Sequence, residues 1–307
     1  MKVKRLAIVS AAILALTGGI ALSGCSSVTE VDAVATVNGT KLTRNEFEDL
    51  AKLLDEAGIF KMTDGSLTAE DSRQLLLTMI NAQVVRDVLD ENKITVSDAD
   101  RQAFRDQLAG SDQLAGYPTG LADYVINLYA EQGALSKVDK ANATQVEDLY
   151  NSAPGASGMM CLRHLVVEDK ATAEKALAEY KDGAEFADLA GKYSTEPNAS
   201  ESGGALRDTT NDKDCIAVSQ YQRQFDLDFV RGALTAEAGS VVGPIKSSFG
   251  WHLIEARPFS EIKDSLVSIF ADNTGAALAD ALWLNADVRV DSQFGKWDAA
   301  SGTIVDL

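Results

Sequence analysis

The chain contains only two histidines, and each lies in a short run of alternating apolar residues. His164 belongs to the run CLRHLVVED and His252 to the run FGWHLIEAR, so both imidazoles are expected in β-strands rather than on loops. Two buried neutral rings can share one proton between them, provided that their remaining nitrogens are paired. Histidines in strands are also often ordinary hydrogen-bonded core residues, and the two runs by themselves leave both interpretations open.

Two phenylalanines form a second candidate group. Phe225 and Phe229 are four residues apart, the spacing that places two side chains on one face of a helix. An aromatic pair at this spacing is most often part of a core, and less often the wall of an apolar pocket.

The chain begins with the features of an export signal. A basic start precedes an apolar run from Leu6 to Leu22, and small residues follow it, so residues 1–24 are expected to be a cleaved signal peptide. The stretch LSGC resembles the lipobox of bacterial lipoproteins, which implies that Cys25 carries lipid. The mature chain would then be anchored to the extracytoplasmic face of the cell membrane without spanning it, with residues 25–32 as a tether. Plain secretion with an incidental cysteine is the alternative.

With Cys25 assigned to lipid, Cys161 and Cys215 remain as an even pair in an oxidising compartment. We predict a disulfide between them; two buried free thiols are the alternative. A cysteine nucleophile is disfavoured, because Cys161 is expected on the face of its strand opposite to His164.

The chain is strongly acidic, with a formal net charge of -18. Removing Lys2, Lys4 and Arg5 with the signal changes this from -18 to -21. Such a charge disfavours nucleic acid as a partner and repels anionic lipid headgroups. We interpret the acidic runs as a solvated surface, and expect neither a metal site nor a cofactor.

The first part of the chain has a helical pattern. A strand ending in an Asn38-Gly39 turn is expected first, and Thr43 with Glu46 fits the capping box of the next helix. Helices are expected over 42–58, 72–92, 97–108, 121–138 and 142–152. The stretch APGASG, residues 153–158, interrupts the pattern and is expected to be a linker.

From Met159 onward the pattern changes to mixed strand and helix. We expect a strand over 161–167, helices over 172–183 and 185–194, a brief strand in 201–208, a helix carrying both phenylalanines, and two strands around a turn within 239–256.

Residues 159–258 resemble the rotamase domain of parvulin-type peptidyl-prolyl isomerases. The matching stretches, in the order and spacing of that family, are RHLVV, GAEFADLAGKYST, SGGAL, GSVVGPI and FGWHLIEA. Residues 33–155, opening with VATVNGTKLTRNEF, resemble the chaperone lobe of PrsA- and SurA-type export foldases. DVRVDSQFGKWD resembles the returning strand of those proteins, within a C-terminal segment 259–307 expected to pack on the N-terminal lobe. The implied fold class is α+β, an all-helical lobe with an inserted parvulin domain.

The resemblance implies two groups of site residues. The catalytic group comprises His164, His252, Glu196 and Ser247. The substrate-binding group comprises Leu206, Phe225, Phe229 and Phe249. In this family the two histidines lie side by side beneath the active site, with a hydroxyl, here Ser247, fixing the far tautomer. Glu196 stands where parvulins carry cysteine or aspartate, and the aromatic residues match the proline pocket.

The chain departs from the family in several places. The family's GGDLG is GGALR here, with Ala205 and Arg207 in place of an aspartate and a glycine, and the stretch before Phe225 is longer and more polar. We expect activity to survive these changes in a weakened form. The loop after RHLVV offers Glu168, Asp169 and Lys170, so no dependence on substrate phosphate is expected.

The resemblance thus implies a lipid-anchored foldase that isomerises X-Pro bonds in unfolded, newly exported proteins, with a homodimer as a further possibility. A non-catalytic holdase chaperone with a degenerate rotamase domain is the alternative. A solute-binding lipoprotein fits poorly, because the chain lacks paired βαβ lobes.

Overall fold

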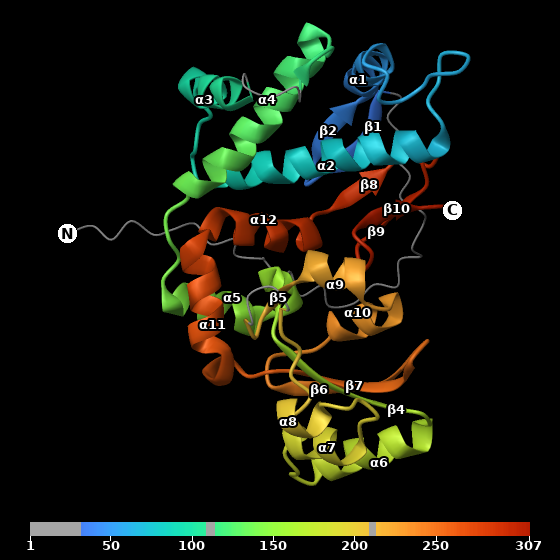
Figure 1. Cartoon of the computed structure of the whole chain (residues 1–307), viewed down its shortest axis with the longest axis vertical. Helices are drawn as coiled ribbons and strands as arrows, with labels where there is room; N and C mark the ends of the chain where they lie inside the picture. The colour runs from blue at the N-terminus through green and yellow to red at the C-terminus, as the bar shows by residue number, and fades with distance from the viewer. Residues whose placement is uncertain (1–31, 109–113, 209–212) are drawn as a thin grey trace, which may run out of the picture. The chain divides into compact units, whose positions relative to one another are not determined.

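The computed structural model describes residues 32–108, 114–208 and 213–307 (Figure 1). Its contacts divide the chain into two compact units. The first consists of Met1–Val138, Ala286–Asp298 and Thr303–Leu307, and the second of Asp139–Asn285 and Ala299–Gly302. The expected signal peptide, Cys25 and the tether up to residue 31 lie outside the described residues. None of the helices in the described part of the chain is both long and apolar enough to cross a membrane.

The sheet of the first unit brings together the two ends of the sequence. Strand β1 (Ala33–Val37) pairs antiparallel with β2 (Thr40–Thr43) on one side and with β8 (Val288–Val290) on the other. The turn between β1 and β2 has positive φ at Asn38 and Gly39, a conformation suited to these residue types. Two further short strands, β9 (Lys296–Asp298) and β10 (Thr303–Val305), pair with each other.

The helices of the first unit are α1 (Arg44–Glu56), α2 (Ala69–Glu91), α3 (Asp98–Leu108) and α4 (Thr119–Ala134), followed by the 3-10 turn η2 (Leu135–Lys137). The expected capping box is present: the Thr43 hydroxyl accepts from the Glu46 N–H, and the Glu46 carboxylate accepts from the Thr43 N–H. Gly58, with φ +69°, follows the end of α1 as expected.

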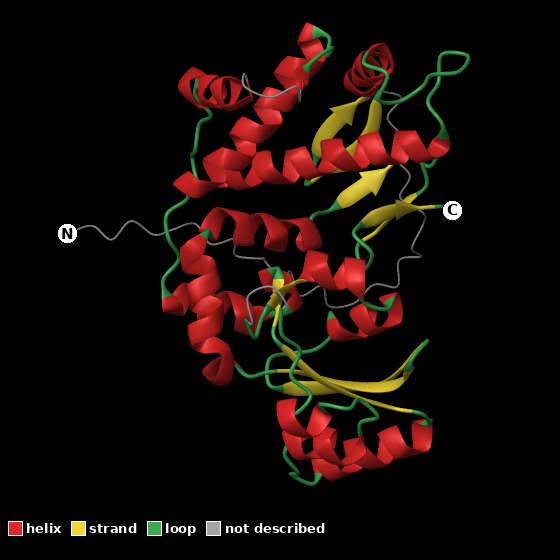
Figure 2. Cartoon of the chain, viewed as in Figure 1, coloured by secondary structure: helices red, strands yellow, loops and turns green. Residues whose placement is uncertain are grey.

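The second unit is a mixture of short helices and strands (Figure 2). Its helical elements are α5 (Ala143–Ser152), η3 (Gly155–Ser157), α6 (Lys170–Lys181), α7 (Phe186–Tyr193), α8 (Ala199–Ser202), α9 (Val218–Gln224), α10 (Leu227–Ala233), α11 (Phe259–Asp272) and α12 (Thr274–Asn285). Its strands are β3 (Met159–Met160), β4 (Leu162–Val167), β5 (Ile216–Ala217), β6 (Ser240–Ser247) and β7 (Gly250–Ala256). The α+β class expected from the sequence is confirmed.

A three-stranded antiparallel sheet, in the order β4-β7-β6, forms the centre of this unit. Because side chains alternate between the two faces of a strand, the sheet separates two clusters of apolar residues. Leu165 and Leu253 pack with α6 and α7 on one face, and Leu162 and Ile254 pack with α9 and α10 on the other. His164 and His252 both lie on the face that packs against α9 and α10.

The structure differs from the expectations at three segments. Residues 153–158, expected to be a linker, contain the turn η3 (Gly155–Ser157), in which Ser157 is buried and its hydroxyl donates to the Pro154 carbonyl at 2.7 Å. Glycine, proline and serine mark a break in a helix but do not reveal whether the break is solvated. Residues 201–208 form no strand, only the end of α8 and an isolated bridge from Ala205 to Arg163.

The third difference concerns the aromatic pair. The helix expected to carry both phenylalanines is broken into α9 and α10, and the extended residue Phe225 lies between them. Asp226 caps the second helix through its side chain, so an N-cap signal within the segment overrides the helical spacing.

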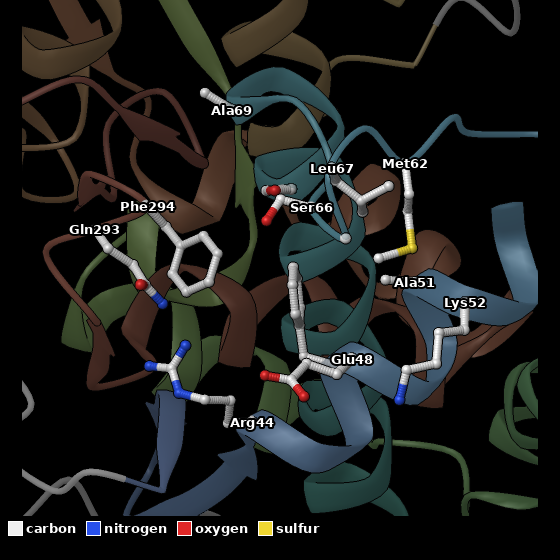
Figure 3. A pocket seen from close by; sticks show the side chains of 13 residues that line it. Arg44, Glu48, Ala51, Lys52, Met62, Ser66, Leu67, Ala69, Gln293 and Phe294 are labelled. Carbon is white, nitrogen blue, oxygen red and sulfur yellow. The ribbon is translucent and has the colours of Figure 1, made fainter.

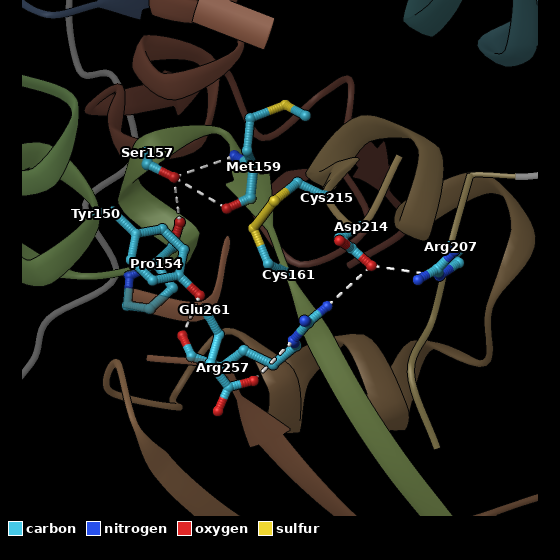
Figure 4. Close-up of a disulfide and its surroundings, with 10 residues drawn as sticks. All are labelled: Tyr150, Pro154, Ser157, Met159, Cys161, Arg207, Asp214, Cys215, Arg257 and Glu261. Atoms are coloured by element: carbon cyan, nitrogen blue, oxygen red, sulfur yellow. Dashed lines mark hydrogen bonds and ion pairs between the residues drawn. A yellow bond between two sulfur atoms is a disulfide. The ribbon is translucent and has the colours of Figure 1, made fainter. Parts of the chain in front are cut away.

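The predicted disulfide is present between Cys161 and Cys215, which are 54 residues apart and both buried. It joins the start of β4 to the end of the polar insertion before β5. Figure 4 shows Asp214, next to Cys215, between the guanidinium groups of Arg257 (3.0 Å) and Arg207 (3.3 Å). The C-terminal end of the insertion is therefore held by the disulfide and by the ion pair between Asp214 and the largely buried Arg257.

We expect the double substitution Cys161→Ala and Cys215→Ala to lower the stability of the second unit by about 2–4 kcal/mol, because the unfolded chain loses a cross-link that closes a long loop. Calorimetry should show a melting temperature roughly 5–15 °C lower for this transition. A midpoint unchanged by the substitution, or by unfolding the wild type in reductant, would contradict the structural role of the bond.

Candidate active site

The two histidines lie next to each other on one face of the central sheet. In the register of β4 and β7, His164 is opposite Ile254 and His252 is opposite Val166, so the two imidazoles are diagonal neighbours. Their rings are nearly parallel, with centroids 5.7 Å apart and an interplanar angle of 11°. The two Nδ1 atoms are 3.4 Å apart, and both residues are about 5% exposed.

Each imidazole has a second polar partner at its far nitrogen. The Ser247 hydroxyl lies 2.7 Å from Nε2 of His252, and the Glu196 carboxylate lies 2.9 Å from Nε2 of His164. Ser247 ends β6 and faces Gly250 across the hairpin, and its oxygen also accepts from the Phe249 N–H at 3.0 Å. The four side chains form a continuous chain of polar contacts across the sheet.

The loop that carries Glu196 is fixed to the strand that carries His164. The Thr195 N–H donates to the Val166 carbonyl at 2.9 Å, and the Val166 N–H donates to the Ser194 hydroxyl at 3.2 Å. The position of the carboxylate therefore depends on β4 itself, although its side chain remains partly solvated, 44% exposed.

The Glu196 carboxylate determines which ring nitrogens donate and which accept in this series of hydrogen bonds. An ionised carboxylate only accepts, so His164 must donate from Nε2, which leaves its Nδ1 as an acceptor. His252 then donates from Nδ1 to His164, and its Nε2 accepts from the Ser247 hydroxyl. All four ring nitrogens are then engaged.

The electrostatics agree with an ionised Glu196 and a neutral His252. The pKa of Glu196 is lowered, chiefly by its hydrogen bond with His164, so the carboxylate is ionised at neutral pH. Burial, and then the neighbouring His164, lower the pKa of His252 to about 4, so this ring is neutral.

An aromatic cluster packs against the imidazole pair. The Phe229 ring makes an edge-to-face contact with each imidazole, and its centroid lies 5.5 Å from that of His164 and 5.3 Å from that of His252. Phe225 stacks on Phe229 at 5.3 Å and contacts Tyr221 at 4.8 Å. The break between α9 and α10 has thus kept the two phenylalanines together, although they are not on one helix.

The four residues expected to bind substrate differ in exposure. Phe229 is only 2% exposed and supports the site from beneath, whereas Leu206 and Phe225 are half-buried and Phe249 is 78% exposed at the hairpin tip. Leu206, Phe225 and Phe229 belong to one apolar cluster on the face of the sheet that carries the imidazole pair.

One residue of the site was not singled out from the sequence. The Gly204 carbonyl accepts from the His164 N–H at 2.9 Å, and a Cβ on Gly204 would come within 2.2 Å of the His164 carbonyl. With φ +77°, this position requires glycine both for its backbone conformation and for its close approach to β4. The doubled glycine of SGGAL was the available signal.

Among the described residues, no group of three or more His, Cys, Asp or Glu side chains is arranged to hold a metal ion. The first unit contains a separate hollow of about 480 Å³ (Figure 3). Arg44, Glu48 and Lys52 extend from α1 along it, and the rings of Phe47 and Phe294 line it with centroids 5.1 Å apart.

The depressed pKa of His252 predicts a specific dependence of stability on pH. The unfolded chain binds a proton at this group near its ordinary pKa of 6.5, whereas the folded chain does so only near 4. The free energy of unfolding should therefore fall by about 3 kcal/mol from this group as pH drops from 6.5 to 4. The lowered pKa of Glu196 removes further stability below its ordinary value of 4.5.

Native-state hydrogen exchange of the β4 and β7 amides measures this loss, with His252→Gln as the comparison. We expect the variant to be less stable at pH 7 but to lose less stability on acidification. An equal loss in both proteins would contradict the assignment of a buried neutral His252.

Comparison with known proteins bears on this site directly. Residues 167–257 match the profile described as a PPIC-type PPIASE domain of the rotamase family. The chain is 27% identical over 298 residues to the foldase protein PrsA 1 of Bacillus cereus, covering 91% of each chain. It is 25% identical over 234 residues to the foldase protein PrsA 3 of Bacillus anthracis, covering 70% of this chain and 77% of that protein.

Among solved structures, PrsA from Bacillus subtilis aligns with 23% identity, covering 84% of this chain and 90% of that one, at a TM-score of 0.29. A TM-score of this size does not by itself support a structural relationship. The chain is thus similar to proteins named PrsA foldases, and residues 167–257 of its second unit, which include His252, match a PPIC-type peptidyl-prolyl cis-trans isomerase domain.

Proposed function

We propose that this protein is a membrane-anchored extracytoplasmic foldase, which isomerises X-Pro bonds in unfolded, newly exported proteins. The observation that carries the proposal is the hydrogen-bonded chain Ser247–His252–His164–Glu196, which ends in an ionised carboxylate beside an apolar surface. His164, His252, Ser247 and Glu196 are the proposed catalytic group.

Rotation about an X-Pro bond has a barrier of about 18–20 kcal/mol because it breaks amide resonance. The planar amide is charge-separated, with a partly negative oxygen, and this polarity diminishes as the bond twists. A dry apolar surface therefore destabilises the planar form relative to the twisted one. In the proposed mechanism Leu206, Phe225 and Phe249 contact the substrate and exclude water, while Phe229 holds the imidazole pair.

Glu196 adds a second electrostatic effect. An ionised carboxylate close to the amide oxygen repels the negative charge that this oxygen carries in the planar form, and repels it less when the bond is twisted. Such a difference favours the transition state, and each tenfold gain in rate requires about 1.4 kcal/mol of it. Glutamate, longer than the cysteine or aspartate of parvulins, remains positioned because its carboxylate is hydrogen-bonded to His164.

A holdase chaperone is the second candidate function. The hollow between α1, α2 and the segment around Phe294 favours it, since apolar rings with charged side chains beside them can accommodate side chains of an unfolded peptide. The two functions are compatible in one protein, and variants in different units separate them.

We expect the full chain from residue 25, with Cys25→Ser for solubility, to accelerate isomerisation of an Xaa-Pro tetrapeptide. Glu196→Gln should lower kcat/KM about tenfold, because it retains a hydrogen-bond acceptor for His164 but removes the charge. The exposed Glu201 in α8 provides a matched control, and Glu201→Gln should leave kcat/KM within twofold.

If the unsubstituted protein were no faster than solvent but suppressed aggregation of an unfolded client, the holdase function would replace the catalytic one. Equal rates for Glu196→Gln and Glu201→Gln would exclude the electrostatic role of Glu196.

We further expect Cys25 to be the site of lipid attachment in a bacterial host. Cell fractionation with labelling by a fatty-acid analogue should place the unsubstituted protein in the membrane fraction with label. Cys25→Ser should release it without label. Membrane retention of the Cys25→Ser protein would contradict the proposed anchor.

A further inference from the structure

Asp226 connects two elements that converge on the imidazole pair. It lies between α9 and α10, and its Oδ1 accepts from the Asp228 N–H at 2.9 Å, which caps the helix carrying Phe229. Its Oδ2 accepts from Ser248, at 2.8 Å from the hydroxyl and 3.2 Å from the backbone N–H. Ser248 occupies the tip of the β6–β7 hairpin, 22 residues further along the chain.

The hairpin tip carries the groups that the site needs. Ser247, one residue before Ser248, contacts Nε2 of His252, and Phe249, one residue after Ser248, has the most exposed of the four side chains expected to bind substrate. The Phe249 N–H also donates to the Ser247 hydroxyl oxygen. A displacement of this turn therefore moves both the hydroxyl partner of His252 and the Phe249 ring.

We propose that Asp226 is a positioning residue, which joins the start of α10 to the hairpin tip and so keeps the Ser247 hydroxyl on His252 and fixes the turn that carries Phe249. This inference rests on the proposed isomerase function for its kinetic consequence, but not for its structural one. The bonds are exposed to solvent, so they contribute little to global stability and act mainly on the position of the turn.

The chemistry of the two carboxylate oxygens provides a selective variant. An amide has one acceptor oxygen, so Asp226→Asn can satisfy either the helix end or Ser248, but not both. Ser248→Ala removes the hydroxyl donor and leaves both the cap of α10 and the charge of Asp226 in place. Asp228→Asn is the matched control, since it removes an exposed carboxylate from the same turn of helix without touching the hairpin.

The test measures two properties of the full chain from residue 25 with Cys25→Ser. The first is kcat/KM on an Xaa-Pro tetrapeptide, with kcat and KM resolved. The second is the tautomer of each imidazole from ring nitrogen-15 chemical shifts, which is unambiguous because the chain has only two histidines. We expect a single tautomer of His252, protonated at Nδ1, in the unsubstituted protein and in Asp228→Asn.

Asp226→Asn should lower kcat/KM about tenfold and Ser248→Ala about threefold. In both variants the Nε2 signal of His252 should move toward that of an imidazole without a hydroxyl donor. The double variant should lose no more activity than Asp226→Asn alone, because both substitutions break the same link.

Unchanged imidazole signals in Asp226→Asn and Ser248→Ala would overturn the proposal, as would a double variant in which the two losses simply multiply. If the unsubstituted protein proved inactive but its His252 signal still responded to both substitutions, the proposed function would fail while the positioning role of Asp226 would stand.

Discussion

The site depends on one constraint: two imidazoles enclosed by a sheet and an aromatic cluster must have every ring nitrogen paired. An unpaired polar atom in such a place costs about 1–3 kcal/mol, and a charged ring costs more. The diagonal placement of His164 and His252 across β4 and β7 pairs one nitrogen of each ring with the other. The remaining two nitrogens require partners from outside the two strands, and the rest of the unit is arranged to supply them.

Those two partners come from segments that are not adjacent in the sequence. Ser247 is the last residue of β6, and the register between β6 and β7 places its hydroxyl beside His252. Glu196 lies on a loop that is bonded to β4 at Val166, and Gly204 is bonded to the same edge of that strand at His164. The disulfide at Cys161 and the buried Arg257 fix the opposite end of β4. The sheet is thus constrained at both ends of the strand that carries His164.

Much of this was predictable because it follows from local rules. Alternation placed both histidines in strands, and the capping box and Gly58 gave the limits of α1. The order of motifs indicated the isomerase domain. The failures arose where burial or a side-chain cap decided the outcome. APGASG became a packed turn, and Asp226 broke the helix expected through Phe225 and Phe229. Neither effect is visible in a pattern of apolar spacing, because that pattern reveals neither the burial of a turn nor the capping of a helix by a side chain.

The pairing of the ring nitrogens also limits what the histidines can do. With all four nitrogens engaged and both residues about 5% exposed, neither ring has a free position from which to exchange a proton with a bound peptide. The reaction requires no such exchange, since rotation about an amide transfers no proton. The pair is better understood as a buried support that orients Glu196 at one end and Ser247 at the other. In the proposed mechanism, the charge beside the substrate is that of the half-exposed Glu196 carboxylate, whose pKa is lowered chiefly by its hydrogen bond with His164. Catalysis by the proposed mechanism would depend on the apolar surface and on one fixed negative charge, so few residues would need to touch the substrate.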